Sequence, residues 1–419
     1  MAKQPHIVLV NQHYWPDIAS TGQHLTDLAE HLAEAGFQVG VLCGRGDYRG
    51  GALRAPVREV RNGVRIRRVG VPGFGRGRLA GRAADYAAFH AGAALRAALE
   101  PRPDLVVSLT TPSLLPATVG AACALRGVPY GIWAMDLHPD VEEGLGLLPG
   151  GRAVSAPLHA ASRAGYAGAG FVVALGPHMA RRVEEKGVPP GRIRKIPVWN
   201  RGSAIRPLDR RENPFRRELG YGDGDFVVLY SGNAGLAHRF DAVLGAADRL
   251  RAEDDVHFLF VGGGPRRPEI EREAARLRLP RFRYLDYVPR DRLARTLAAG
   301  DVHLLTLRGD MAGLVAPSKL YASMAAARPV LMVGPAASDP GEVVRREDVG
   351  AVVDPEREGA GAGAAASLAA EILALRDDPD LRAALGRRAR AAFERSYDRD
   401  VVCRRWEALL RERLSPARA

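Results

Sequence analysis

The chain has 419 residues, a formal net charge of +12 and a hydrophobic content of 47%. This length and composition are typical of a globular protein with two domains, each able to bury its own core. No run approaches the roughly 20 unbroken apolar residues of a membrane-spanning helix.

The cysteines and the N-terminus indicate a cytoplasmic protein. Cys43, Cys123 and Cys403 lie far apart in apolar surroundings, which favours reduced, buried thiols over disulfides or a metal site. "MAKQPHIVLV" runs directly into an expected strand, without the layout of a signal peptide.

Positive charge is concentrated in one segment. Residues 45–82 contain 11 arginines against Asp47 and Glu59. Anionic lipid headgroups, a phosphorylated substrate or nucleic acid could each explain this surplus, as could a solvated surface that binds nothing. Nucleic acid ranks low because neither interleaved aromatic residues nor a helix-turn-helix pattern accompanies the arginines.

The pattern along the first half predicts a doubly wound domain. "HIVLV" reads as a buried strand, and the helix that follows places Leu25, Leu28, Ala29 and Leu32 on one face. The further expected strands are "QVGVLC", "VRIRRV", "DLVVSLT", "YGIWAMD" and "GFVVAL". Apolar strands that alternate with helices favour a parallel sheet covered on both faces.

The same alternation restarts in the second half, after a stretch rich in Pro, Gly and charge. The expected strands there are "FVVLYSG", "VHFLFVGGG", "FRYLDYV", "DVHLLTL", "PVLMVGP" and "VGAVVD", followed by two late helices. We therefore predict an α/β protein with Rossmann-like domains at 1–203 and 204–398 that face each other across a cleft. The last helix, 399–414, is expected to fold back onto the first domain.

Glycine-containing loops mark candidate phosphate sites, because ligands of open α/β sheets bind beyond the carboxyl ends of the strands. Gly22 follows the first strand and would let a ligand approach the backbone closely. The alternative is a purely structural role in a tight turn, with Thr21 as the N-cap of the helix. In the second half, "YSGNAGLAHRF" and "VGGGP" are the other candidates, and His238 and Arg239 could supply cationic contacts. No dinucleotide fingerprint or Walker lysine motif is present, which argues against a nicotinamide or ATP site.

Lys319 is one of only four lysines, and it lies in the first turn of an expected helix opened by Pro317 and Ser318. The helix dipole disfavours a cation there by a few tenths to about 1 kcal/mol. An anion in front of the helix would explain the residue. A diphosphate held by the N–H groups of Gly313, Leu314 and Val315 would provide that anion, and a surface lysine without function is the alternative.

These motifs, in this order, resemble the family-4 retaining glycosyltransferases of the GT-B fold, particularly their WbuB-like branch. The resemblance rests on the early segment "VNQHYWPDIASTGQHLTDLAEHLAEAGFQVGVL", on "WAMDLHPD", "IPVWNRGSAIRPLDRRENPFRRELG" and "VVLYSGNAGLAH", and on "FLFVGGGP", "YVPRDRLARTLAAGDV", "GLVAPSKLYASMAAARPV" and "DPGEVVRREDVGAVVD". It implies sugar transfer from a nucleotide diphosphate donor, with retention of configuration and no required metal or other cofactor. A UDP-linked donor is expected.

The resemblance also implies where the donor would bind. The base would lie near Tyr287 and Val288, and the sugar near Gly341 and Glu342. The diphosphate would lie against Gly232, His238 and the 313–319 junction, which contains Gly313, Leu314, Val315, Ser318 and Lys319, and Gly22 would close over it. Asn233, Arg239 and Gly263 complete the expected donor-binding residues. Two departures stand out. Ala322 occupies the position of a glutamate that grips the ribose in many relatives, and Asn233 and His238 stand where relatives carry cations, so Lys319 would supply the missing charge.

On the acceptor side, Asp136 and His138 follow the end of an expected strand. Either could position the sugar or the acceptor hydroxyl, with a helix cap and a structural histidine as the alternatives. Tyr14, Asp17, Thr21 and Asp140 complete the expected acceptor side. The partner would be a lipid-linked or small-molecule acceptor, and the protein could rest peripherally on an anionic membrane through residues 45–82.

Two other functions remain open at this point. A nucleotide-sugar 2-epimerase shares the GT-B architecture, although its acid–base carboxylates are not evident. A non-catalytic partner of another transferase is the second alternative, and Ala322 and Asn233 favour it.

Overall fold

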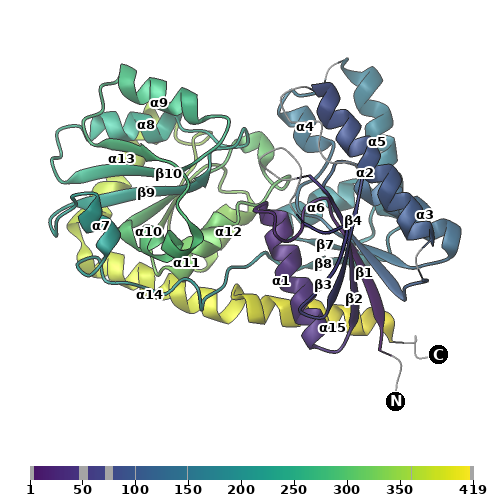
Figure 1. Cartoon of the computed structure of the whole chain (residues 1–419). Coiled ribbons are helices and arrows are strands. Elements are labelled where there is room, and N and C mark those ends of the chain that lie inside the picture. Colours follow the sequence, from purple (N-terminus) through teal and green to yellow (C-terminus); the bar gives the residue numbers. More distant parts are fainter. Residues whose placement is uncertain are drawn as a thin grey trace. The chain divides into compact units, whose positions relative to one another are not determined.

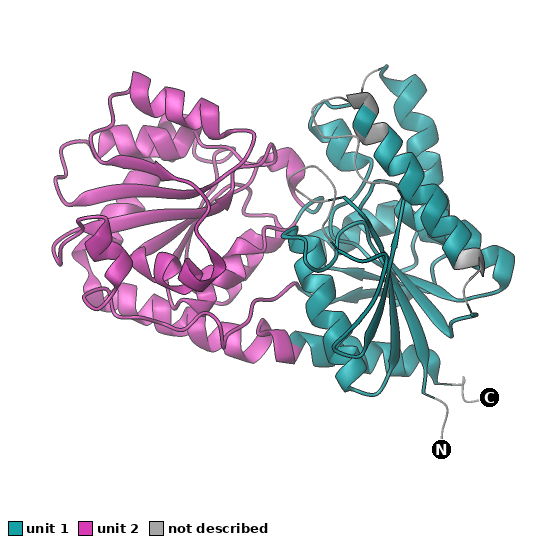
Figure 2. Ribbon diagram, in the orientation of Figure 1, with its two compact units in different colours: residues 1–197, 313–315, 402–419 teal, residues 198–312, 316–401 magenta. Residues whose placement is uncertain are grey.

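The computed structural model describes residues 4–46, 55–70, 79–99, 101–148, 150–359 and 361–415. Its contacts divide the chain into two compact units, coloured separately in Figure 2. Unit 1 comprises residues 1–197, 313–315 and 402–419, and unit 2 comprises residues 198–312 and 316–401. The division after Pro197 lies slightly before the boundary expected after residue 203.

Unit 1 is built on an eight-stranded sheet in the order β3-β4-β2-β1-β5-β6-β7-β8 (Figure 1). Its strands are β1 His6–Val10, β2 Gln38–Gly44, β3 Arg58–Arg61, β4 Val64–Val69, β5 Leu105–Leu109, β6 Tyr130–Trp133, β7 Phe171–Ala174 and β8 Ile193–Lys195. All neighbouring strands are parallel except β3 and β4. The helices are α1 Ser20–Glu34, α2 Leu79–Leu99, α3 Leu115–Arg126, α4 Asp140–Gly144, α5 Arg152–Ala167, α6 Pro177–Glu185 and, for most of its length, α15 Arg399–Leu414.

Unit 2 holds a six-stranded, fully parallel sheet in the order β11-β10-β9-β12-β13-β14. Its strands are β9 Phe226–Asn233, β10 Val256–Gly263, β11 Phe282–Leu285, β12 Val302–Thr306, β13 Val330–Val333 and β14 Gly350–Val353. The helices are α7 Pro214–Glu218, α8 Asp241–Arg249, α9 Arg267–Arg276, α10 Leu293–Ala299, α11 Lys319–Ala325, α12 Asp339–Arg346, α13 Ala362–Asp377 and α14 Pro379–Ser396. The two parallel sheets confirm the predicted α/β fold with two Rossmann-like domains.

The C-terminal helix α15 contributes to the core of unit 1. The ring of Trp406 is fully buried and lies 4.8 Å from the ring of Trp133 in β6. Leu409 and Leu410 are also buried. Burying side chains of this size contributes roughly 1.5–3 kcal/mol each, so this helix is part of the packing of unit 1.

Several local expectations differ from the structure. Three helices, rather than two, follow β14 in the described residues. An antiparallel hairpin, β3–β4, was not anticipated; its turn residues Asn62 and Gly63 have φ angles of 47° and 78°, as a two-residue primed turn requires. Thr21 lies inside α1, whose N-cap is Ala19, so the alternative interpretation of Thr21 as a helix cap is wrong.

Burial of the thiols agrees with the sequence. Cys43, Cys123 and Cys403 are all buried as thiols. Within the described ranges, no helix is long and apolar enough to cross a membrane.

Candidate functional site

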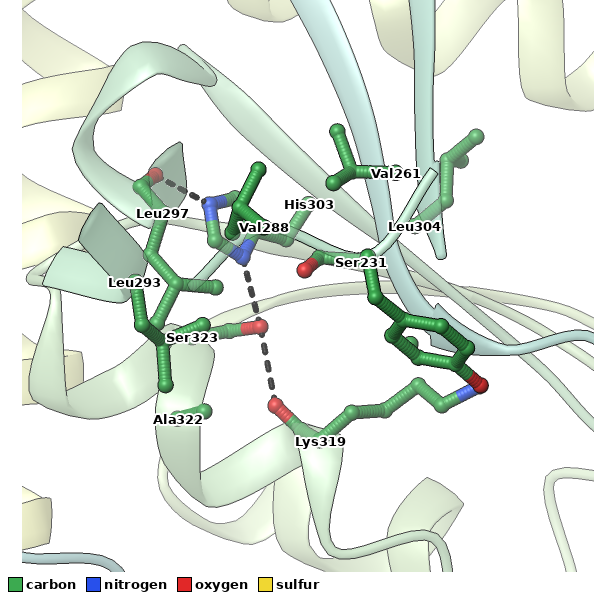
Figure 3. A pocket seen from close by; sticks show the side chains of 12 residues that line it. Ser231, Val261, Val288, Leu293, Leu297, His303, Leu304, Lys319, Ala322 and Ser323 are labelled. Atoms are coloured by element: carbon green, nitrogen blue, oxygen red, sulfur yellow. Dashed lines mark hydrogen bonds between the residues drawn. The ribbon is translucent and has the colours of Figure 1, made fainter. Parts of the chain in front are cut away.

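A pocket of about 200 Å³ lies in unit 2 beside the ends of β9 and β10 (Figure 3). It is lined by Ser231, Gly232, Val261, Tyr287, Val288, Leu293, Leu297, His303, Leu304, Lys319, Ala322 and Ser323. The structure therefore brings together four of the residues that the sequence singled out for the donor site: Gly232, Tyr287, Val288 and Lys319.

Lys319 begins α11, and its side chain reaches back to the end of β9. Nζ lies 2.5 Å from the Tyr230 hydroxyl and 3.3 Å from the carbonyl oxygen of Asn233. It also lies 4.2 Å from the centroid of the Tyr230 ring, a cation–π distance. Tyr230 donates its own hydroxyl hydrogen to Asn233 O at 2.9 Å, so its oxygen is free to accept from the lysine.

The third neighbour of Nζ is His238, whose Nε2 lies at 3.4 Å. The Nδ1 atom of His238 lies 2.5 Å from the carbonyl oxygen of Thr306, and a carbonyl only accepts, so Nδ1 carries the hydrogen. Nε2 is then an acceptor for the lysine. Burial and the charge of Lys319 lower the pKa of His238 to about 3. The expectation that His238 supplies positive charge is therefore wrong, because the imidazole is neutral.

Burial also lowers the pKa of Lys319, to about 7. Among the described residues no carboxylate forms an ion pair with this side chain; its three acceptors are all neutral. The contacts of Nζ at 3.3 Å and 3.4 Å are long, so a ligand can replace them. A half-buried cation whose protein partners are all neutral is suited to binding an anion.

Arg239 does not join this group. Its guanidinium forms a two-pronged ion pair with Asp241, at 3.1 Å and 2.7 Å, and the hydrogen bonds to Asp241 raise its pKa. It lines a different groove, beside α8 and α9. The positive charge of the pocket in unit 2 thus rests on Lys319.

The glycines at the strand ends allow a close crossing of backbones. Gly262 has a φ of 141°, and a Cβ there would lie 2.1 Å from the carbonyl oxygen of Gly232. A Cβ on Gly263 would lie 2.9 Å from the Tyr287 ring. A Cβ on Gly232 would be in ordinary contact with Lys319 Cε at 3.5 Å, but the φ of 134° at this position favours glycine.

Deeper in the pocket, a buried histidine fixes α11 relative to α10. His303 Nε2 donates to the carbonyl oxygen of Leu297 at 2.8 Å, and Nδ1 lies 2.7 Å from Ser323 Oγ (Figure 3). Burial lowers the pKa of His303 to about 4, which keeps it neutral. Sequence reasoning missed Tyr230, Ser231, His303 and Ser323; Tyr230 and Ser231 directly precede Gly232, and Ser323 stands one helical turn after Lys319.

Other expected donor residues lie outside this pocket. Residues 313–315 belong to unit 1, where Leu314 O accepts from Leu137 N at 2.9 Å. In α12, the N–H of Gly341 already donates to Ser338 Oγ at 3.2 Å, and Glu342 lies 3.7 Å from Arg346. Ser318 precedes α11 without a capping hydrogen bond from its side chain. Gly22 packs α1 against the backbone of His13, where a Cβ would meet the carbonyl carbon at 3.0 Å.

A second polar cluster lies in unit 1, after β6. The Nδ1 atom of His138 lies 2.8 Å from both carboxylate oxygens of Glu142, and Ser113 Oγ donates to the same carboxylate. Burial opposes protonation of His138, but the hydrogen bond and charge of Glu142 raise its pKa overall. Burial raises the pKa of Asp136, partly offset by His138. The sequence predicted Asp136 and His138 as functional residues but did not identify Glu142.

The remaining acceptor-side candidates are held within unit 1. Asp140 accepts an ion-pair hydrogen bond from Lys186, whose side chain is 6% exposed. Asp17 Oδ2 lies 2.5 Å from His13 Nδ1, and the Tyr14 side chain is buried, which raises its pKa. Thr21 Oγ1 accepts from Asn11 Nδ2 at 3.5 Å.

A small cavity of about 10 Å³ is lined by Thr110, Leu114, Pro116, Ala117, His138, Ser162 and Tyr166. Its volume has room for about one water molecule and for no sugar. In the described parts of the chain, no group of three or more His, Cys, Asp or Glu residues could hold a metal ion.

Solved structures share this arrangement of two parallel-sheet domains. Sucrose-phosphate synthase from Thermosynechococcus elongatus aligns with a TM-score of 0.72 at 18% identity, over 99% of this chain and 100% of that one. Anabaena HepE in complex with UDP-glucose aligns with a TM-score of 0.71 at 15% identity, over 97% of this chain and 99% of that one. The protein therefore has the GT-B fold.

Sequence comparisons identify the family. Residues 21–199 match the glycosyl transferase 4-like domain, and residues 225–378 match the glycosyl transferases group 1 domain. A Pseudomonas aeruginosa protein described as a glycosyltransferase, WbjE, is 27% identical over 76% of each chain. WcaI of Escherichia coli K12, described as a colanic acid biosynthesis glycosyl transferase, is 26% identical over 61% of this chain and 63% of its own. The chain belongs to the family-4, group 1 glycosyltransferases, and these relatives are consistent with the WbuB-like branch.

Proposed function

We propose that this glycosyltransferase moves a sugar from a nucleoside diphosphate sugar, with uridine as the expected nucleoside, to an acceptor hydroxyl with retention of configuration. The observation that carries the proposal is Lys319, a half-buried cation without a carboxylate partner among the described residues, at glycine-rich strand ends. UDP-glucose is bound by HepE, a structure with the same fold. Transfer into a cell-surface polysaccharide is in keeping with the colanic acid role described for WcaI.

In this proposal the diphosphate lies against Gly232. Its oxygens replace the carbonyl oxygen of Asn233 and Nε2 of His238 as partners of Lys319 Nζ. The base lies against Tyr287, which is 52% exposed, and Val288. An exposed aromatic ring beside apolar side chains suits the face of a planar base. Neutral His238 and Tyr230 then orient the lysine rather than contribute charge.

The mechanism requires stabilisation of the leaving group more than a strong protein base. The bond between the anomeric carbon and the diphosphate oxygen breaks, and the acceptor oxygen bonds to the same face of the sugar. The acceptor proton passes to a phosphate oxygen of the donor. Lys319 and backbone N–H groups aimed at the departing diphosphate would supply the largest stabilisation, and no metal is required.

The test is calorimetric titration with UDP-glucose, UDP-N-acetylglucosamine, GDP-mannose and dTDP-glucose. We expect one of them to bind the wild type and to bind Lys319→Ala at least tenfold more weakly, because a charged hydrogen bond contributes roughly 1.5–3 kcal/mol. Lys195→Ala, which removes an exposed lysine from β8, is the matched control and should bind normally.

The same titration separates the alternative functions. Failure of every donor to bind would contradict the proposal and favour the non-catalytic partner. Interconversion of the bound sugar in the absence of any acceptor would favour the 2-epimerase.

The acceptor is proposed to be lipid-linked, presented at an anionic membrane surface. Arg58, Val60, Arg65 and Arg67 share one face of the β3–β4 hairpin, and Val60 is 73% exposed. Arg68, counted in the same segment, is buried against Glu59 and the carbonyl oxygen of Trp15, so it cannot contribute. Residues 47–54 and 71–78 of the segment lie outside the described residues.

Cosedimentation with vesicles containing phosphatidylglycerol tests this surface. Binding at low salt should weaken in Arg58→Glu/Arg65→Glu and persist in Arg152→Glu, which changes an exposed arginine at the start of α5. A wild type that never binds such vesicles would point to a soluble acceptor.

A further inference from the structure

Glu142 belongs to the polar cluster that follows β6 in unit 1. It lies in the short helix α4, four residues after His138, and its two oxygens are equidistant from Nδ1 of that histidine. We infer that Glu142 is a positioning residue that holds His138 as a cation and fixes which ring nitrogen faces the reactants. This role rests on the proposed transferase function.

The hydrogen bonds determine the orientation of the imidazole. A carboxylate only accepts, so the Nδ1 atom of His138 carries a hydrogen and donates it to Glu142. Nε2, on the opposite side of the ring, has no protein partner among the described residues. The carbonyl oxygen of His138 accepts from Ser162 Oγ at 2.9 Å, which holds the backbone as well.

Glu142 is itself held in place. Its carboxylate accepts from Ser113 Oγ, which comes from the loop between β5 and α3. The hydrogen bonds from His138 and Ser113 lower the pKa of Glu142 against the opposing effect of burial. The carboxylate is therefore charged at neutral pH, and it fixes the orientation of the imidazole through a charge-assisted hydrogen bond.

The other charged groups near His138 cannot replace Glu142. Asp140 is paired with Lys186, and Tyr166 of α5 is buried with its pKa raised. Asp136 is close enough to act electrostatically but forms no hydrogen bond to the ring. The protonated imidazole thus presents a single free donor, Nε2–H, beside the Asp136 carboxylate. Such a donor can hold a hydroxyl oxygen of the donor sugar or of the acceptor by a charge-assisted hydrogen bond, which fixes its orientation.

The chain supplies a matched control on the same helix. Glu143 forms a similar contact, 2.8 Å to His159 Nε2, but its side chain is 54% exposed. Glu142→Gln and Glu143→Gln therefore remove the same charge from adjacent positions, each beside a histidine.

The first measurement needs no substrate. Titration of ¹⁵N-labelled histidines by NMR should give His138 a pKa above its ordinary value with a hydrogen on Nδ1. Glu142→Gln should lower that pKa by about one unit, whereas Glu143→Gln should leave the pKa of His138 unchanged. A wild-type His138 with an ordinary or lowered pKa, or one unmoved by Glu142→Gln, would overturn the inference even if the kinetic variants failed to fold.

The second measurement uses whichever nucleotide sugar of the calorimetric panel binds the wild type. Because Glu142 raises the pKa of His138, its loss should move the fall in kcat to lower pH. At pH 8 we expect kcat to drop about tenfold, with KM for the donor within twofold and partial recovery in Glu142→Asp. An unchanged pH profile in folded Glu142→Gln would contradict the role. Absence of turnover in the wild type would instead contradict the proposed function, while the NMR result still stands.

Discussion

Two lysines in this chain lie in similarly restricted surroundings, yet their charges are available for different purposes. Lys186, in unit 1, is 6% exposed and forms an ion pair with Asp140. Lys319, in unit 2, is half-buried, and its ammonium group has a phenol, an imidazole and a carbonyl oxygen as its hydrogen-bond partners among the described residues. The charge of Lys186 is balanced by a carboxylate of the same unit. The charge of Lys319 must be balanced by a ligand, or its amine loses the proton.

The lack of a carboxylate partner also explains the pKa of Lys319. Burial alone lowers the pKa of Lys319, to about 7, because no carboxylate opposes it. The neighbours of Lys319 are polar enough to orient the ammonium group but carry no negative charge. This is the arrangement that leaves the largest electrostatic gain for an incoming diphosphate.

Removal of Lys319 should have the largest effect on turnover. We expect Lys319→Ala to lower kcat about a hundredfold, because loss of one donor to a developing oxyanion typically has an effect of roughly that size. The far-ultraviolet circular dichroism and melting temperature should be unchanged, since no buried carboxylate is left unpaired. Steady-state release of the nucleoside diphosphate measures the effect, and near-wild-type turnover would remove Lys319 from the mechanism.

A smaller effect is expected from pH. The ligand-free Lys319 loses its proton as pH rises through about 7, and the diphosphate binds the protonated form. Affinity for a nucleotide sugar should therefore fall by up to tenfold per pH unit above 7, and binding at pH 8 should take up protons. A nucleotide sugar is the right probe because its diphosphate does not titrate near neutral pH.

Calorimetry in buffers of different ionisation enthalpy measures this proton uptake directly. Lys319→Arg provides the control, since a guanidinium stays protonated throughout this range. Equal affinities of the wild type at pH 6.5 and 8.5 would show that the lysine is charged without its ligand.

The sequence revealed more of the fold than of the site. Alternating strands and helices predicted both parallel sheets, because burial on both faces leaves continuous apolar runs. The Pro-Ser-Lys junction identified Lys319, but its partners Tyr230 and His238 lie 89 and 81 residues earlier in the chain, where no local spacing relates them. The charge of His238 also depends on its burial, which its residue type does not reveal.

Other omissions had a signal in the sequence. Asn62-Gly63 between two β-branched runs is a strong hairpin pattern, and Glu142 stands at the i+4 position from His138. Arg68 also had a signal, because strand alternation places it on the inward face with Val64 and Ile66. Only the structure shows which groups satisfy its buried guanidinium, namely Glu59 and the carbonyl oxygen of Trp15.

Substitution of Lys186 should have the smallest effect on turnover but should clearly lower the stability of the fold. Lys186→Met leaves Asp140 without its partner, and we expect a loss of roughly 1–3 kcal/mol in the free energy of unfolding, since Asp140 is 29% exposed and can be partly rehydrated. In Lys186→Met/Asp140→Asn the unpaired charge is gone, so most of that loss should be recovered. Urea denaturation measures both variants, and kcat per folded molecule should stay within twofold of the wild type. A raised acceptor KM in the double variant would instead return Asp140 to the acceptor side, where the sequence first placed it, and would end the contrast between the two lysines.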